Sequence, residues 1–238
     1  MGVLGYLKQH LSDYFYAAAF VLAISFIFSQ QPIQVFSLQQ ADAPVTIVLD
    51  PGHGGSDGGT QRPDGTPESR INLEISRRTA DLLSFLGIRC IMTRNQDVSL
   101  ETQGDTVRQR KNSDLQNRVS LVNHTENGIL ISIHQNFFPQ SQYSGPQVFF
   151  SQTPESEDFA RLMQSALNQT LAPDSNRVCK SAKGIYLMER ISRPGILVEC
   201  GFLSNPAEAA KLSEPGYQKQ LACVIASTAA LFISPAVS

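Results

Sequence analysis

Residues 45–55 have the sequence VTIVLDPGHGG, in which five apolar or β-branched residues lead into a glycine-rich turn that carries His53. A run of this kind, bounded by turn residues, predicts a buried strand. The glycines on both sides of His53 would let the backbone approach a bound ion closely. This stretch alone is compatible with a metal ligand and with an ordinary loop histidine.

Two further buried strands are predicted, and each carries a polar residue near its end. Residues 129–134 end at His134, and the run Gly195–Gly201 carries Glu199. Alternation along the first of these strands sets His134 on the same face as Ser132. Open α/β sheets collect their chemistry outside the carboxyl ends of the strands, and an unpaired buried carboxylate or imidazole is costly. The polar strand ends therefore indicate a functional site rather than core.

A fourth polar residue, Glu68, lies at a predicted helix start. Thr66 is the expected cap and Pro67 lies in the expected first turn, before apolar residues at helical spacing. Glu68 could simply complement the helix dipole. Catalytic zinc sites, however, use three ligands of the His/His/Glu kind and leave a fourth position for water. His53, Glu68 and His134 supply that set.

Four segments in order carry a family resemblance: LDPGHGG (residues 49–55), GTPE (65–68), SIHQN (132–136) and LVECGFLSN (197–205). Together they resemble the signatures of zinc-dependent N-acetylmuramoyl-L-alanine amidases. The resemblance spans the chain from about Val45 to Phe232 and also includes Arg94, Arg118 and Asn123.

The resemblance implies one Zn²⁺ per chain, held by His53, Glu68 and His134, with Glu199 as the catalytic carboxylate. Ser69 and Gln135 depart from the residues usual at their positions, and we interpret these departures as bearing on substrate fit. Asp50 is either a residue that orients a ligand histidine or a turn-former after its strand.

The substrate implied by the resemblance is peptidoglycan, and the bond is the amide between N-acetylmuramic acid and L-alanine of the stem peptide. A zinc peptidase acting on stem peptides and a catalytically silent wall-binding regulator are the alternatives. The anchor, linker and bare catalytic domain resemble the short spore-cortex, germination-related amidases. An accessory activator protein is left open.

Composition sets limits on the class of protein. The chain has 238 residues, 42% of them hydrophobic, and a formal net charge of −2. No basic face for nucleic acid is expected, so nucleic acid is excluded as a partner. The length beyond the N-terminal segment suits one α/β domain.

The N-terminal part predicts export. Residues 14–28 are nearly all apolar, follow Lys8, and precede a proline- and glutamine-containing stretch. We therefore expect a signal peptide or signal-anchor at residues 1–29, a linker at 30–44 and the zinc amidase catalytic domain at 45–234. The protein would be exported and either anchored to the membrane or secreted to the cell wall or to the intermembrane space of a forespore.

Strand and helix patterns alternate along the domain, which predicts a single three-layer α/β domain. A twisted, largely parallel sheet of about six strands should carry helices on both faces. The predicted strands are Val45–Asp50, Gly87–Thr93, Gly128–His134, Gln147–Phe150, Gly184–Met188 and Gly195–Cys200. The predicted helices are Glu68–Phe85, Leu115–Glu126, Glu155–Leu171 and Tyr217–Phe232. The four cysteines lack CxxC spacing, and a Cys200–Cys223 disulfide is left open.

Overall fold

The computed structural model describes residues 44–62 and 64–234. The expected N-terminal segment and nearly all of the expected linker lie outside these residues. Among the residues described, no helix combines the length and apolar character needed to cross a membrane.

The described strands form one sheet in the order β2-β1-β3-β6-β4-β5. Their bounds are β1 (Thr46–Pro51), β2 (Arg89–Met92), β3 (Gly128–Asn136), β4 (Gln147–Phe150), β5 (Lys180–Ser181) and β6 (Gly195–Phe202). Strands β2, β1, β3 and β6 run parallel, whereas β4 runs antiparallel to β6 and parallel to β5. The predicted six-stranded, largely parallel sheet is confirmed.

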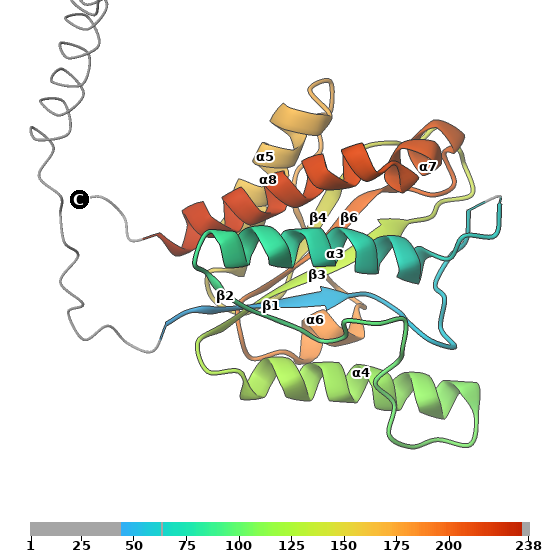
Figure 1. The fold of residues 1–238 in the computed structure, drawn as a ribbon, viewed down its shortest axis with the longest axis vertical. Helices are drawn as coiled ribbons and strands as arrows, with labels where there is room; N and C mark the ends of the chain where they lie inside the picture. Colours follow the sequence, from blue (N-terminus) through green and yellow to red (C-terminus); the bar gives the residue numbers. More distant parts are fainter. Residues whose placement is uncertain (1–43, 63, 235–238) are drawn as a thin grey trace, which may run out of the picture. The chain divides into compact units, whose positions relative to one another are not determined.

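Helices cover both faces of this sheet, as expected for three layers (Figure 1). One face carries α3 (Glu68–Phe85), α5 (Ser156–Leu171) and α8 (Pro215–Ile233), and the opposite face carries α4 (Val107–His124) and α6 (Tyr186–Arg190). A short helix, α7 (Pro206–Ser213), follows β6 and packs against α8.

Alternate residues of the central strands enter two separate cores. Ile131 and Val198 belong to the core beneath α3, α5 and α8, whereas Leu130 and Leu197 belong to the core beneath α4 and α6. Cys200 is buried in the first core, on the α8 side, as the alternation predicts. All four cysteines are free thiols. Because both faces are covered, the carboxyl edge of the parallel strands is the place left for a site.

Several predicted elements are wrong in extent or type. Helix α4 begins at Val107, eight residues before the predicted Leu115, because Thr106 and Gln109 form a capping box in a stretch with no apolar face. The predicted strand Gly184–Met188 is largely the helix α6. Thr66 does not cap α3, since the N-cap residue is Pro67.

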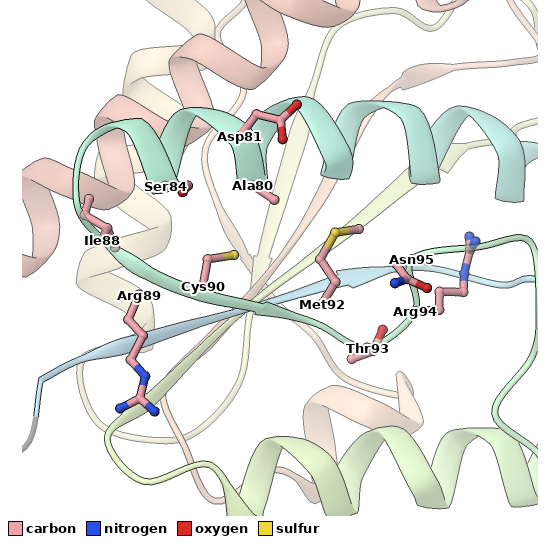
Figure 2. Close-up of a pocket in the computed structure, with 10 residues that line it drawn as sticks. All are labelled: Ala80, Asp81, Ser84, Ile88, Arg89, Cys90, Met92, Thr93, Arg94 and Asn95. Atoms are coloured by element: carbon pink, nitrogen blue, oxygen red, sulfur yellow. The ribbon is translucent and has the colours of Figure 1, made fainter.

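A groove of about 680 Å³ lies between α3 and the edge strand β2. Figure 2 shows Cys90 and Met92 projecting from β2 toward α3, while Arg89 points away from that helix. Thr93 and Arg94 lie at the far end of the groove, where the chain leaves β2. None of the four predicted site residues lines this groove.

Candidate metal centre and general base

The four predicted site residues lie at the carboxyl edge of the central strands. His53 follows the end of β1, and His134 lies near the end of β3. Glu199 of β6 pairs in register with His134 on the neighbouring parallel strand. Glu68 is the first residue of α3, whose N-terminal end lies at the same edge.

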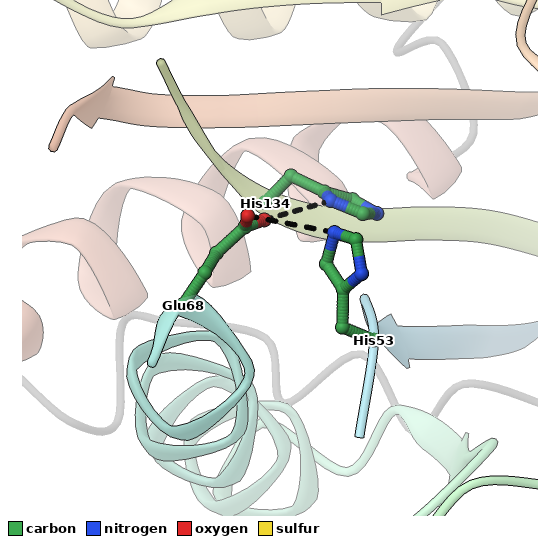
Figure 3. A group of neighbouring side chains, drawn as sticks. All are labelled: His53, Glu68 and His134. Atoms are coloured by element: carbon green, nitrogen blue, oxygen red, sulfur yellow. Dashed lines mark hydrogen bonds and ion pairs between the residues drawn. The ribbon is translucent and has the colours of Figure 1, made fainter. Parts of the chain in front are cut away.

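The Glu68 carboxylate faces both histidine rings, which lie edge to face against each other (Figure 3). His53 Nε2 is 3.4 Å from Glu68 Oε2, and His134 Nδ1 is 3.0 Å from Glu68 Oε1. The potential ligand atoms of all three residues lie within 4.8 Å of one another. A tetrahedral ion with bonds of about 2.0 Å needs neighbouring ligand atoms roughly 3.3 Å apart. The two nitrogen–oxygen distances, one to each oxygen of Glu68, lie on either side of that spacing, so small side-chain movements would let the three residues hold one metal ion.

The carboxylate of Glu68 is held in place by donors other than the histidines. Thr60 N donates to Oε2 at 3.1 Å, and Gln135 N and Asn72 Nδ2 each donate to Oε1 at 3.1 Å. Burial alone raises the pKa of Glu68, but His134, His53 and the Gln135 amide together lower it to about 2. The side chain is therefore an anion at neutral pH, as a metal ligand must be.

His134 lies directly over Gly52. A Cβ atom at position 52 would lie 2.1 Å from both Cε1 and Nε2 of His134, which is closer than real contacts allow. The glycine of the turn is therefore required so that the imidazole can pack against backbone. This packing leaves Nδ1 of His134 directed at Glu68.

Asp57 contacts the other histidine. Its Oδ2 atom is 3.1 Å from His53 Nδ1, and His53 itself has a left-handed backbone with φ of 62°. A hydrogen bond from His53 lowers the pKa of Asp57 against the opposing effect of burial. Sequence reasoning missed Asp57.

Two buried arginines hold the backbone of the turn that carries His53. Arg94 donates to Pro51 O at 2.9 Å and to Gly52 O at 3.0 Å. Arg118 donates to Pro51 O at 3.0 Å and to His53 O at 2.8 Å. Both side chains are almost fully buried. Because two guanidinium groups fix these carbonyls, the point from which the His53 side chain leaves the backbone is well defined.

Asp50 does not orient either histidine, so that proposed role is wrong. Its Oδ1 atom accepts from Arg118 at 2.6 Å and from Thr93 at 2.7 Å, and its Oδ2 atom accepts from Ser132 at 2.7 Å. Asp50 is 1% exposed, and its carboxylate neutralises the buried Arg118 that holds the turn. Asp57, rather than Asp50, is the acid that contacts a candidate histidine ligand.

Glu199 is the other acid of the site. Its Oε2 atom is buried and has no hydrogen-bond partner among the described residues. Burial raises its pKa to about 7, with His134 opposing and Glu68 reinforcing the rise. A buried carboxyl oxygen without a protein partner is expected to face water, a ligand or an ion.

Comparison with known proteins identifies the family of this chain. The family model described as N-acetylmuramoyl-L-alanine amidase matches residues 47–230. The chain belongs to this amidase family. A similar curated relative is the germination-specific N-acetylmuramoyl-L-alanine amidase of Bacillus subtilis, which is 42% identical over 75% of this chain and 76% of the relative.

Two solved amidases have similar structures. The CwlD amidase from Clostridioides difficile, solved in complex with the GerS lipoprotein, is 35% identical with a TM-score of 0.76 and covers 79% of this chain and 98% of its own. An N-acetylmuramoyl-L-alanine amidase from Clostridium difficile 630 is 26% identical with a TM-score of 0.69, over 80% of this chain and 97% of its own.

Two residues of this amidase that depart from the usual pattern each follow a candidate ligand in the chain, Ser69 after Glu68 and Gln135 after His134. Ser69 and Gln135 are 1% and 3% exposed. Gln135 donates to Asn72 Oδ1 at 3.1 Å, and Ser69 O accepts from Arg94 at 2.8 Å. Gln135 supports Glu68 through its own amide and through Asn72, whereas the Ser69 carbonyl contacts Arg94, so that an effect of either residue on substrate fit stays a prediction. Asn72, which sequence reasoning also missed, lies one helical turn after Glu68, a spacing that signals contact.

Proposed function

We propose that this chain hydrolyses the amide between N-acetylmuramic acid and L-alanine of peptidoglycan stem peptides, with one Zn²⁺ held by His53, Glu68 and His134. The observation that carries the proposal is the spacing around Glu68, with its two oxygens 3.4 Å from His53 Nε2 and 3.0 Å from His134 Nδ1. Membership of the amidase family supports the choice of bond.

The donor set fits zinc. Two imidazoles and one carboxylate, with a fourth position left open, are the ligands of catalytic zinc sites. When bound, the ion would act as a Lewis acid that acidifies water and polarises the scissile carbonyl. Glu68 contributes one negative charge, and the histidine nitrogens that face it supply neutral lone pairs when they are deprotonated.

Glu199 would act as the general base and then as the general acid. Its Oε2 atom, which is buried and has no hydrogen-bond partner in the described part of the chain, is available to take a proton from the attacking water. A pKa raised to about 7 lets the same carboxyl group return that proton to the leaving nitrogen, and the charge of an ion beside it would lower this pKa. Proton return matters for an amide, because an unprotonated amine is a very poor leaving group.

The proposed setting is the spore cortex. The germination-specific role named for the relative from Bacillus subtilis supports this setting for the present chain.

We propose that residues 1–29 export the chain and tether it to a membrane, or are removed. Residues 30–44 would then be a linker and 45–234 the catalytic domain. An exported amidase would act on peptidoglycan in the wall or in the forespore intermembrane space.

The solved complex of a related amidase with a lipoprotein supports an accessory partner for this chain as well.

Metal replacement tests the proposal. Full-length protein stripped of metal should not hydrolyse purified peptidoglycan, and one equivalent of Zn²⁺ should restore hydrolysis. Replacing any one of the three candidate ligands by alanine should weaken zinc binding. Wild-type zinc content in all three variants would refute the ligand assignment. Unchanged hydrolysis by metal-free protein would refute the zinc mechanism.

A further inference from the structure

The two candidate histidine ligands are oriented by different means. His134 rests against Gly52, so its ring is fixed by packing. His53 is about one-fifth exposed and directs its Nδ1 atom at Asp57 Oδ2, 3.1 Å away. Its Nε2 atom then faces Glu68 Oε2 at 3.4 Å. The Asp57 contact therefore lies on the side of the imidazole that faces away from Glu68 and the candidate metal site.

The position of Asp57 is itself fixed from several directions. Gly59 N donates to Asp57 Oδ1 at 3.2 Å, and Lys111 Nζ lies 3.2 Å from Oδ2. The Asp57 backbone closes the turn by two hydrogen bonds with Gly54, of 2.7 and 3.1 Å. The carboxylate thus has a defined place relative to the His53 ring, and Lys111 connects it to α4.

A carboxylate in this place determines which ring nitrogen carries the proton. Asp57 accepts a hydrogen bond, so it favours the tautomer with hydrogen on Nδ1 and leaves the lone pair on Nε2. Nε2 is the atom directed at Glu68. Without Asp57, the partly exposed ring could rotate or adopt the other tautomer. Either change would turn the Nε2 lone pair away from the candidate metal site or place a proton on it.

We infer that Asp57 is a positioning residue for zinc binding, which orients His53 and fixes its tautomer, and that Lys111 on α4 supports Asp57. This inference rests on the proposed function only in taking His53 as a zinc ligand. It assigns the role that the sequence offered to Asp50, and it extends the metal centre outward to the surface of α4.

Zinc affinity tests the inference, measured by chelator competition on metal-free full-length protein. Asp57→Ala should weaken binding by about 10- to 100-fold, the usual effect of removing such a partner. Asp57→Asn keeps an acceptor oxygen in nearly the same volume and should lose less. Lys111→Met should lose at most about fivefold, because Lys111 is half-exposed.

The matched control is Asp64→Asn, which changes another acid between His53 and Glu68. Asp64 is half-exposed and pairs with Arg62 and with Thr66 N rather than with a histidine. This variant should keep its zinc affinity within about twofold of wild type. Co²⁺ bound in place of zinc should show an altered visible spectrum in Asp57→Ala and an unaltered one in Asp64→Asn.

The outcomes separate this inference from the proposed function. Wild-type protein that binds no zinc would overturn both. If wild-type protein binds zinc and both Asp57 variants bind it within twofold of wild type, the positioning role alone is overturned. Should Asp57 matter only for folding, its variants would have a lower unfolding midpoint when metal-free while their zinc affinity and Co²⁺ spectrum stayed unchanged, and this result would also overturn it.

Discussion

Gly52→Ala should disable the proposed metal centre without changing any of its candidate ligands. Gly52 is not among the glycines with positive φ, so its backbone accepts alanine. The new Cβ atom would lie 2.1 Å from Cε1 and Nε2 of His134, whereas ordinary contacts begin at 3.4 Å. The ring or the turn must therefore move by about 3.4 − 2.1 = 1.3 Å.

A displacement of that size is large for a catalytic site. Misplacing a group by about 1 Å can cost roughly 10²-fold in rate, and disturbing a metal ligand costs about 10- to 100-fold in metal affinity. We expect losses on both scales, measured as zinc affinity by chelator competition and as the initial rate of peptidoglycan hydrolysis.

Gly58→Ala is the matched control in the same loop. A Cβ atom at Gly58 would meet only Pro67 Cβ, at 3.2 Å, a contact that a small shift relieves. The control should therefore stay close to wild type in both measurements. If Gly52→Ala binds zinc and hydrolyses peptidoglycan as well as Gly58→Ala does, the placement of His134 over Gly52 does not matter for function, and the geometry argued above is refuted.

Three further predictions concern the base, the buried acid and the N-terminal segment. Glu199→Gln should keep its zinc and lose about 10²-fold or more in turnover, so near-normal hydrolysis would remove Glu199 from the mechanism. Burial raises the pKa of Asp50, but Arg118, Thr93 and Ser132 outweigh it and lower the pKa from 3.8 to about 2. The ionised group therefore contributes about 2 kcal/mol above roughly pH 4, lost as the pH falls toward 2. Asp50→Asn should accordingly reduce the free energy of unfolding more at pH 7 than at pH 2.5 in urea titrations, and equal losses at both pH values would contradict the assignment. Full-length protein should fractionate with membranes, or appear outside the cytoplasm after cleavage; an intact cytoplasmic product would count against export.

The strands that carry the site were predictable because their pattern and their chemistry agree. β1, β3 and β6 are runs of apolar residues buried on both faces, and such runs are distinctive in sequence. His53 follows the end of β1, and His134 and Glu199 lie near the ends of β3 and β6. His53, His134 and Glu199 therefore indicate the carboxyl edge from the sequence alone, and in the structure they lie there.

The errors come from segments whose local pattern is weak. Residues 184–188 are a short apolar run that periodicity cannot assign to strand or helix, and tertiary packing beneath the sheet makes α6 of it. The first turns of α4 are polar and exposed, so only the capping pair Thr106 and Gln109 signals where the helix begins.

The prediction that Asp50, rather than Asp57, orients a histidine is wrong for a different reason. Both acids flank His53 in sequence, and the choice between them depends on Arg118, which lies 68 residues after Asp50. A buried arginine needs carboxylate partners, and the fold gives Arg118 both Asp50 and Asp114. Asp57 is then left to contact the histidine. Such an assignment depends on long-range packing, which a local motif does not contain.

The identity of the new amino terminus tests the central claim most directly. Purified peptidoglycan digested by the zinc-loaded full-length protein should release intact stem peptides that begin with a free L-alanine amino group. The muramic acid should keep a bare lactyl carboxylate, with the glycan strands uncut, as mass spectrometry of the products would show. A zinc peptidase has the same metal chemistry but cuts elsewhere in the stem. New amino termini at residues other than L-alanine would therefore contradict the amidase function.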